Sequence, residues 1–298
     1  MKTIRTISAL ILPALLALTA CTDAGDMPGT PVPPSGAVRI TATIAGQTDT
    51  RVTMNNDGSG TFTTGDTWGM YTRLPDGTTI NNNLAFAYGS TTLYWRNLST
   101  TQPVTFSAHY PRQTDVSNPE AYRFNLFSSS NRDLLFATAT ASPGEEVKLN
   151  FRHLMHRLVI RLTKDDDVEG NLDEAWITVY NMKISTIVNL LDGTADVDTE
   201  PGTEIYPILG SATLDYITVP QDLSAGNDWI RIRLNNKYYY YNVPASLKPG
   251  PHPLRLESGK QLTLNLNLKK SKVMFTSSAI TEWDSRDLVD VQLYKSGI

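Results

Sequence analysis

Residues 133–162 read DLLFATATASPGEEVKLNFRHLMHRLVIRL, and this stretch decides the fold. Apolar residues occupy the odd positions of 147–151, and a period of two is typical of a strand with one buried face. They occupy the even positions of 158–162. Because a strand cannot change parity without an inserted residue, we expect a bulge, a bend or a change of sheet between His153 and Arg157. The chain is predicted to pass from one β-sandwich to the next at this point.

Short strand-like runs separated by turn residues continue on both sides of this stretch. Turn residues gather at Pro75-Asp76-Gly77, at Asn81-Asn82-Asn83 and at Asn235-Asn236, and no amphipathic helix of useful length interrupts the pattern. At 298 residues the chain is long enough for two domains that each bury a core. The sequence therefore predicts an all-β fold with two β-sandwich domains in tandem, residues 37–164 and residues 165–298.

The predicted boundary between these domains is an acidic run, DDDVEG, at residues 165–170. Asp165, Asp167 and Glu169 would take positions one, three and five of a calcium-binding EF-hand loop. Position twelve is then Trp176, where a bidentate glutamate is required. We therefore interpret the run as a solvated linker and expect no metal site, with an irregular site of oxygen ligands as the alternative.

The first 45 residues contain three segments of different character. Residues 1–20 have a positively charged start and an apolar centre, which predicts a signal peptide. The run LTAC that follows the apolar centre resembles a bacterial lipobox, so we expect cleavage between Ala20 and Cys21 and a lipid on Cys21, the single cysteine. The proline-rich residues 21–36 are predicted to form an extended tether, and the alternating residues 38–45 the first strand.

Several motifs, in their order along the chain, resemble those of the fimbrillin-like lipoproteins of Bacteroides and its relatives. The motifs are FTTGDTWGMYT at 62–72, VTFSAHYPR at 104–112, FATATASPGEEVKLNFRHLMHRLVIRL at 136–162, SGKQLTLNLNL at 258–268 and ITEWD at 280–284. The resemblance implies transthyretin-like sandwich domains and a pilus subunit (stalk, tip or anchor) that acts in cell adhesion. It also implies other pilus subunits as partners through strand exchange, and a lipid-anchored location in the fimbrium at the surface of the outer membrane.

The resemblance further points to one arginine near the N-terminus. In pilins of this type a protease cuts at an arginine after the first strand, that strand leaves, and a donor strand from the next subunit takes its place. Arg51, which follows VRITATIAGQTDT at 38–50, matches this position best. In the alternative, Arg51 is an ordinary loop residue and the first strand stays in place.

The sequence shows no catalytic motif. On a strand His153 and His156 would face opposite sides, so they do not form a ligand pair, and we interpret His153 as a hydrogen-bonded structural residue. Nucleophile elbow, zinc-protease, phosphate-loop and dinucleotide motifs are all missing. We therefore predict a non-enzyme without catalytic residues or cofactor, and the formal net charge of -4 argues against a nucleic-acid partner.

A second function class stays open because of the tyrosine run 238–241. Tyrosines on an exposed strand can stack on sugars, and Tyr239 and Tyr241 are the candidate glycan contacts. The rival hypothesis is thus a carbohydrate-binding surface lipoprotein of a nutrient-uptake system. Glycans or proteins on host or bacterial surfaces are candidate partners under either hypothesis.

Overall fold

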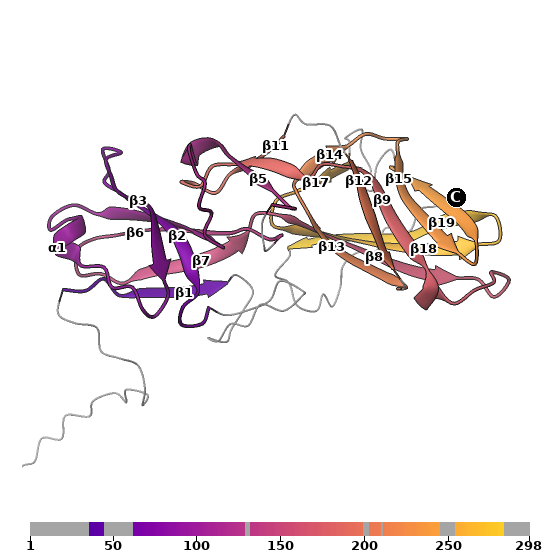
Figure 1. The fold of residues 1–298 in the computed structure, drawn as a ribbon, viewed down its shortest axis with the longest axis horizontal. Helices are drawn as coiled ribbons and strands as arrows, with labels where there is room; N and C mark the ends of the chain where they lie inside the picture. The colour runs from indigo at the N-terminus through magenta and orange to yellow at the C-terminus, as the bar shows by residue number, and fades with distance from the viewer. Residues whose placement is uncertain are drawn as a thin grey trace, which may run out of the picture. The chain divides into compact units, whose positions relative to one another are not determined.

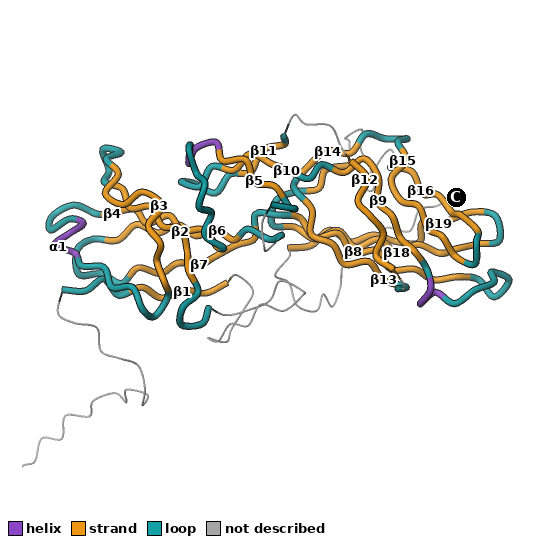
Figure 2. The backbone as a smooth tube through the Cα atoms, viewed as in Figure 1, coloured by secondary structure: helices purple, strands orange, loops and turns teal. Residues whose placement is uncertain are grey.

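The computed structural model describes residues 36–44, 62–128, 132–198, 203–209, 211–244 and 254–282. The predicted signal peptide 1–20, Cys21, most of the tether and Arg51 lie outside the described residues. The regular secondary structure of the described chain is almost entirely strand, as Figures 1 and 2 show, so the prediction of an all-β fold is confirmed. None of its helices is long and apolar enough to cross a membrane.

The strands of the first half are β1 Ile40–Ile44, β2 Thr67–Arg73, β3 Thr79–Ala87, β4 Val104–Tyr110, β5 Tyr122–Asn125, β6 Leu135–Ala141, β7 Val147–His153 and β8 His156–Lys164. Those of the second half are β9 Trp176–Met182, β10 Ser185–Val188, β11 Ala195–Val197, β12 Thr203–Leu209, β13 Thr213–Thr218, β14 Gln221–Leu223, β15 Asp228–Leu234, β16 Lys237–Asn242, β17 Leu254–Leu256, β18 Lys260–Lys269 and β19 Lys272–Glu282. The helical segments are single turns, α1 Trp95–Leu98, η1 Pro119–Ala121 and η2 Leu172–Glu174.

A six-stranded sheet in the order β1-β7-β6-β4-β2-β3 carries the first core. Alternate residues of its strands point to one face, as the burial pattern of β7 shows, because successive side chains of a strand leave on opposite sides. This N-terminal core contains Val38, Ile44, Phe62, Trp68, Met70, Phe86, Trp95, Val104, Phe106, Ala108, Leu135, Ala137, Ala141, Val147, Leu149 and Phe151.

The opposite face of this sheet is covered by the three-stranded sheet β11-β10-β5. Tyr71 of β2 and Phe136 of β6 are buried there against Phe124 of β5 and Val188 of β10. Hydrogen bonds fix the cover, since the hydroxyl of Ser107 donates to the backbone oxygen of Leu191 at 2.7 Å. The six-stranded sheet is thus buried on both sides over part of its area.

Gly69 of β2 lies directly under the imidazole of His109, its register partner on β4. A methyl group at this position would lie 2.1 Å from His109 Cε1 and 2.5 Å from Asn83 Oδ1. We therefore expect Gly69→Ala to lower the free energy of unfolding by about 1–3 kcal/mol, the usual cost of overpacking. Urea denaturation measures this loss.

The matched control for Gly69→Ala removes the ring that the methyl group meets. In a His109→Ala background the same glycine substitution should cost clearly less, because the closest contact is then absent. An equal cost in both backgrounds would show that the space under His109 is not what requires glycine.

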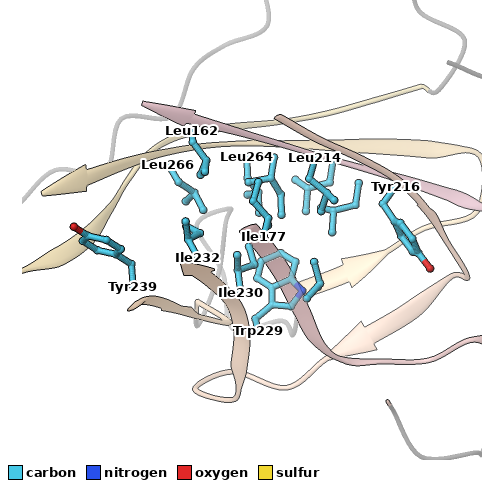
Figure 3. Close-up of a cluster of buried hydrophobic side chains, with 14 of the residues drawn as sticks. Leu162, Ile177, Leu214, Tyr216, Trp229, Ile230, Ile232, Tyr239, Leu264 and Leu266 are labelled. Carbon is cyan, nitrogen blue, oxygen red and sulfur yellow. The ribbon is translucent and has the colours of Figure 1, made fainter. Parts of the chain in front are cut away.

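A second sandwich pairs the sheet β12-β9-β15-β16 with the sheet β13-β8-β18-β19. The apolar side chains of both sheets face one another and form one buried cluster, the C-terminal core, as Figure 3 shows. The labelled residues from β8, β13 and β18 are Leu162, Leu214, Tyr216, Leu264 and Leu266, and those from β9, β15 and β16 are Ile177, Trp229, Ile230, Ile232 and Tyr239.

The chain changes sheet where the parity of the sequence changes. β7 ends at His153 in the six-stranded sheet, and β8 begins at His156 in the second sandwich, so the predicted change of sheet is confirmed. The two residues between them, Leu154 and Met155, are fully buried. They turn the chain without exposing apolar surface.

The strands that pair with β8 place it in the second sandwich, although the sequence predicted it in the first domain. β8 pairs with β13 and β18, and its inward residues share one core with Val168 and Ile177. The acidic run 165–170 therefore joins two sheets of one sandwich, and Asp165 within it binds Lys269 and Asn267. We propose that the domain boundary lies at Leu154–Met155 and not after residue 164.

Candidate strand-exchange site

The candidate site is the edge strand β1 together with its hydrogen-bonded neighbour in the same sheet, β7. β1 lies at the end of the six-stranded sheet and pairs with β7 in parallel, with Ile40 opposite Val147 and Ile44 opposite Phe151. Because it is an edge strand, its second row of backbone donors and acceptors has no ladder partner among the described residues. β1 can therefore leave without opening any other strand pair of this sheet.

The side chains of β1 close the N-terminal core from one side. Ile44 is 2% exposed and Val38, just before the strand, is 7% exposed, whereas Ile40 and Ala42 are half-buried. On the neighbouring strand β7, Val147, Leu149 and Phe151 are fully buried. A chain without β1 would expose that apolar row of β7 and the backbone groups beside it.

Few polar contacts hold β1 beyond its ladder. The hydroxyl of Thr43 donates to Asn150 Oδ1 at 2.7 Å, and the start of the strand is tied to a loop through the backbone nitrogen of Val38, which donates to Leu93 O at 2.9 Å. Thr41 and Lys148, which face each other in the register, are both exposed. The contacts on the solvent side are thus easily replaced by those of another strand.

The floor under β1 is aromatic. The ring centroid of Phe151 lies 4.7 Å from that of Phe62 and 5.0 Å from that of Trp68, and Phe62 and Trp68 are 4.9 Å apart. Trp68 is fully buried and Trp95 is 6% exposed, so both are core residues. These rings contact one another independently of β1, because none of the three belongs to that strand.

The three histidines in the described part of the chain, His109, His153 and His156, lie on different strands and each has its own surroundings. His153 Nδ1 lies 2.6 Å from Asp133 Oδ2 in the buried interior, which confirms that His153 is hydrogen-bonded. His156 lies on another sheet and bonds to the backbone oxygen of Glu257 at 2.9 Å. Burial lowers the pKa of His156 to about 4 and that of His109 to about 3, so both are neutral at physiological pH. Among the described residues no group of three His, Cys, Asp or Glu side chains is placed to hold a metal ion.

The candidate glycan contacts Tyr239 and Tyr241 pack against the C-terminal core, Tyr239 buried and Tyr241 half-buried. Tyr239 is 5% exposed in the C-terminal core, and Tyr241 packs there with its ring centroid 6.2 Å from Trp229 and 6.4 Å from Phe275. Burial raises the pKa of Tyr241 to about 12. The exposed tyrosines are their neighbours Tyr238 and Tyr240.

The exposed aromatic side chains of this sheet were missed by sequence reasoning, although a signal for them exists. The register pairs Arg233 with Tyr238 and Arg231 with Tyr240, and directly opposed residues of an antiparallel pair share a face. Since the arginines point away from the core, Tyr238 and Tyr240 do so as well. The two-residue turn at 235–236 was enough to predict this parity.

This sequence is similar to a known protein family. A family model described as fimbrillin-like matches residues 38–283, which is more than half of the chain. No curated protein matches the sequence. The match includes β1 and all the sheets described above.

Solved structures share the fold. A candidate cell adhesion protein of Bacteroides uniformis superposes with a TM-score of 0.63 at 19% identity, covering 83% of this chain and 99% of that one. A second, from Bacteroides ovatus, gives 0.56 at 19% identity and covers 84% and 99%. A third, from Bacteroides thetaiotaomicron, gives 0.50 at 22% identity and covers 78% and 93%. At these identities the likeness concerns the fold alone.

Proposed function

The chain belongs to the fimbrillin-like family, and from this premise we propose that it is a surface fimbrial subunit that assembles by exchange of β1 for a strand of the next subunit. Its role is structural and adhesive, in the stalk, at the tip or at the base of the fimbria. The position of β1 as a parallel edge strand over a preformed apolar floor carries the proposal. No step of this function requires catalysis.

The energetics favour exchange once β1 has left. An empty site exposes Val147, Leu149 and Phe151 of β7 to water, together with a row of unpaired backbone groups. Any incoming strand with alternating apolar residues covers both, which is the physics of β-augmentation. Assembly is therefore driven by completion of the sandwich.

Proteolysis would start this process. In the proposal Arg51 is the cleavage site, since it follows β1 by seven residues and cleavage there breaks the covalent link between β1 and the rest of the sheet. Only non-covalent contacts, the ladder with β7 and the packing of Val38 and Ile44, then keep β1 in place. The signal peptide 1–20 and a lipid on Cys21 would first deliver the chain to the surface of the outer membrane. Residues 21–36 would then act as the tether.

The first test follows cleavage and assembly in the native cell. Arg51→Ala should abolish both an N-terminus at Val52 and the SDS-resistant ladder of oligomers, because β1 then stays in place. Arg39→Ala, at an exposed arginine just before β1, is the matched control and should leave both unchanged. A ladder of normal strength from Arg51→Ala would overturn the processing step.

A second test addresses strand exchange itself. Cysteines introduced by Thr41→Cys and Lys148→Cys occupy register partners on β1 and β7, so a disulfide between them would lock β1 to the sheet. We expect oxidised protein to remain monomeric after cleavage and reduced protein to assemble. Equal assembly in both states would rule out departure of β1.

A further inference from the structure

The outer face of the sheet formed by β9, β15 and β16 carries aromatic rings interleaved with arginines. Two rows of register partners cross the three strands on this side, Trp176–Arg233–Tyr238 and Thr178–Arg231–Tyr240, and within them Thr178 is buried. Tyr180 follows Thr178 on the same side of β9. We call Trp176, Tyr180, Arg231, Arg233, Tyr238 and Tyr240 the aromatic–arginine face.

This face concentrates the exposed rings of the described chain. Trp176 is 39% exposed, Tyr238 52% and Tyr240 59%, and they are three of the five large apolar or aromatic residues that are exposed among the described residues. Single exposed rings need no explanation, but a cluster on three neighbouring strands is a sign of an interaction site.

The arginines stack on the rings and hold them in place. The guanidinium carbon of Arg233 lies 5.0 Å from the ring centroid of Trp176, and that of Arg231 lies 4.9 Å from Tyr180 and 5.6 Å from Tyr238. Arg233 also donates from Nη2 to Asn236 Oδ1 at 2.9 Å. No carboxylate of the described residues pairs with Arg233, so its charge is available to an anion from outside.

Groups that bind hydroxyls lie at the other end of the face. A hollow of about 250 Å³ is lined there by Tyr180, Arg231, Asp228, Tyr240 and Asn242, among others. Asp228 precedes Arg233 by five residues on β15, which at the rise of a strand separates their backbones by about 16 Å. The face therefore offers a row of rings with a cation at one end and polar acceptors at the other.

We propose that the aromatic–arginine face binds an acidic polysaccharide. One side of a pyranose ring presents C–H groups, which pack on the electron-rich face of an aromatic ring such as Tyr238 or Tyr240. A sugar carboxylate would pair with the guanidinium of Arg233, and sugar hydroxyls would bond to Asp228 and Asn242 in the hollow. A row of exposed rings across three neighbouring strands suits an extended sugar chain better than a protein anchor, which needs a deep apolar pocket.

The proposal is independent of strand exchange. The face lies on strands of the C-terminal core, whereas β1 and β7 border the N-terminal core. It goes beyond the proposed fimbrial function because it gives the subunit a ligand of its own. It also moves the glycan contact from Tyr239 and Tyr241 to Tyr238 and Tyr240, on the opposite side of the same strand.

The test measures binding of oligogalacturonate to the full-length chain in detergent by calorimetry. We expect Arg233→Gln to weaken binding about tenfold and Tyr240→Ala about threefold to tenfold. Tyr240→Phe keeps the ring and should bind normally. Phe127→Ala removes an exposed ring elsewhere and is the matched control. Near-ultraviolet circular dichroism verifies that each variant is folded.

Two comparisons make the assignment falsifiable. The methyl-esterified oligosaccharide has the same rings without the charge, and we expect it to bind at least tenfold more weakly; equal binding would overturn the acidic specificity. Absence of oligogalacturonate binding, or binding that no substitution on the face changes, would overturn the site itself. Tyr240→Ala should leave the oligomer ladder intact, so failure of this proposal is distinguishable from failure of strand exchange.

Discussion

Tyr239→Ala is expected to lower the free energy of unfolding by about 3 kcal/mol, whereas Tyr240→Ala, one residue further along the same strand, should lower it by less than about 1 kcal/mol. Tyr239 lies opposite Ile232 and is 5% exposed in the C-terminal core. Its removal leaves a cavity between the two sheets. Tyr240 is 59% exposed and loses only surface contacts.

The pair of substitutions is its own control. Both substitutions replace a tyrosine of β16 by alanine. The change in strand propensity and the effect on the unfolded state are therefore nearly the same for the two variants. Urea denaturation of the two variants gives the difference directly. Similar losses, or a larger loss from Tyr240→Ala, would mean that the hairpin is shifted by one residue, which would turn every side chain of β16 over.

The same hairpin shows how far the sequence could be interpreted and where interpretation stopped. The turn at 235–236 and the inward set on β15 were predictable, because Asn tolerates the left-handed conformation that both residues adopt, with φ of 46° and 60°. The parity of the tyrosine run follows from that turn by counting. Which tyrosines are exposed was not predicted from the sequence, because four identical residues in succession show no alternation between apolar and polar side chains.

Other features depended on contacts that no local pattern contains. The change of parity near His153 predicted the change of sheet, since a period-two rule is local. The pairing of β8 with β18, more than ninety residues later, is not local, and the acidic run 165–170 looked like a boundary for that reason. The same holds for β1, whose parallel pairing with β7 is set by the closure of the core and not by its own residues.

The second large effect concerns acid. Burial lowers the pKa of His109 to about 3, with a smaller contribution from the charge of Arg112, and lowers that of His156 to about 4 against a weaker opposite effect of Glu257. Both folded pKa values lie below the value of about 6.5 in the unfolded chain. Stability from these groups is therefore full above pH 6.5 and is lost as the pH falls towards 4 and then 3.

The hydrogen bonds explain why neither ring accepts a proton. The backbone N–H of Gln113 donates to His109 Nε2 at 3.2 Å. A proton on Nε2 would replace this hydrogen bond by repulsion between two N–H groups. In His156 the bond to the carbonyl of Glu257 requires the hydrogen on Nδ1, and Nε2 is buried without a partner among the described residues. A proton there would leave a buried N–H group without an acceptor.

We expect the free energy of unfolding to fall by on the order of 3 kcal/mol for His156 and 5 kcal/mol for His109 between pH 6.5 and the folded pKa of each, in addition to what the carboxylates contribute. His156→Gln separates the two contributions, because glutamine can still donate to Glu257 O but does not titrate. Its stability, measured by urea denaturation at a series of pH values, should decline less between pH 6.5 and 4 than that of the parent chain. Parallel curves would show that the pKa of His156 is the same in the folded and unfolded chain, and the acid sensitivity would then have to come from His109 and the carboxylates.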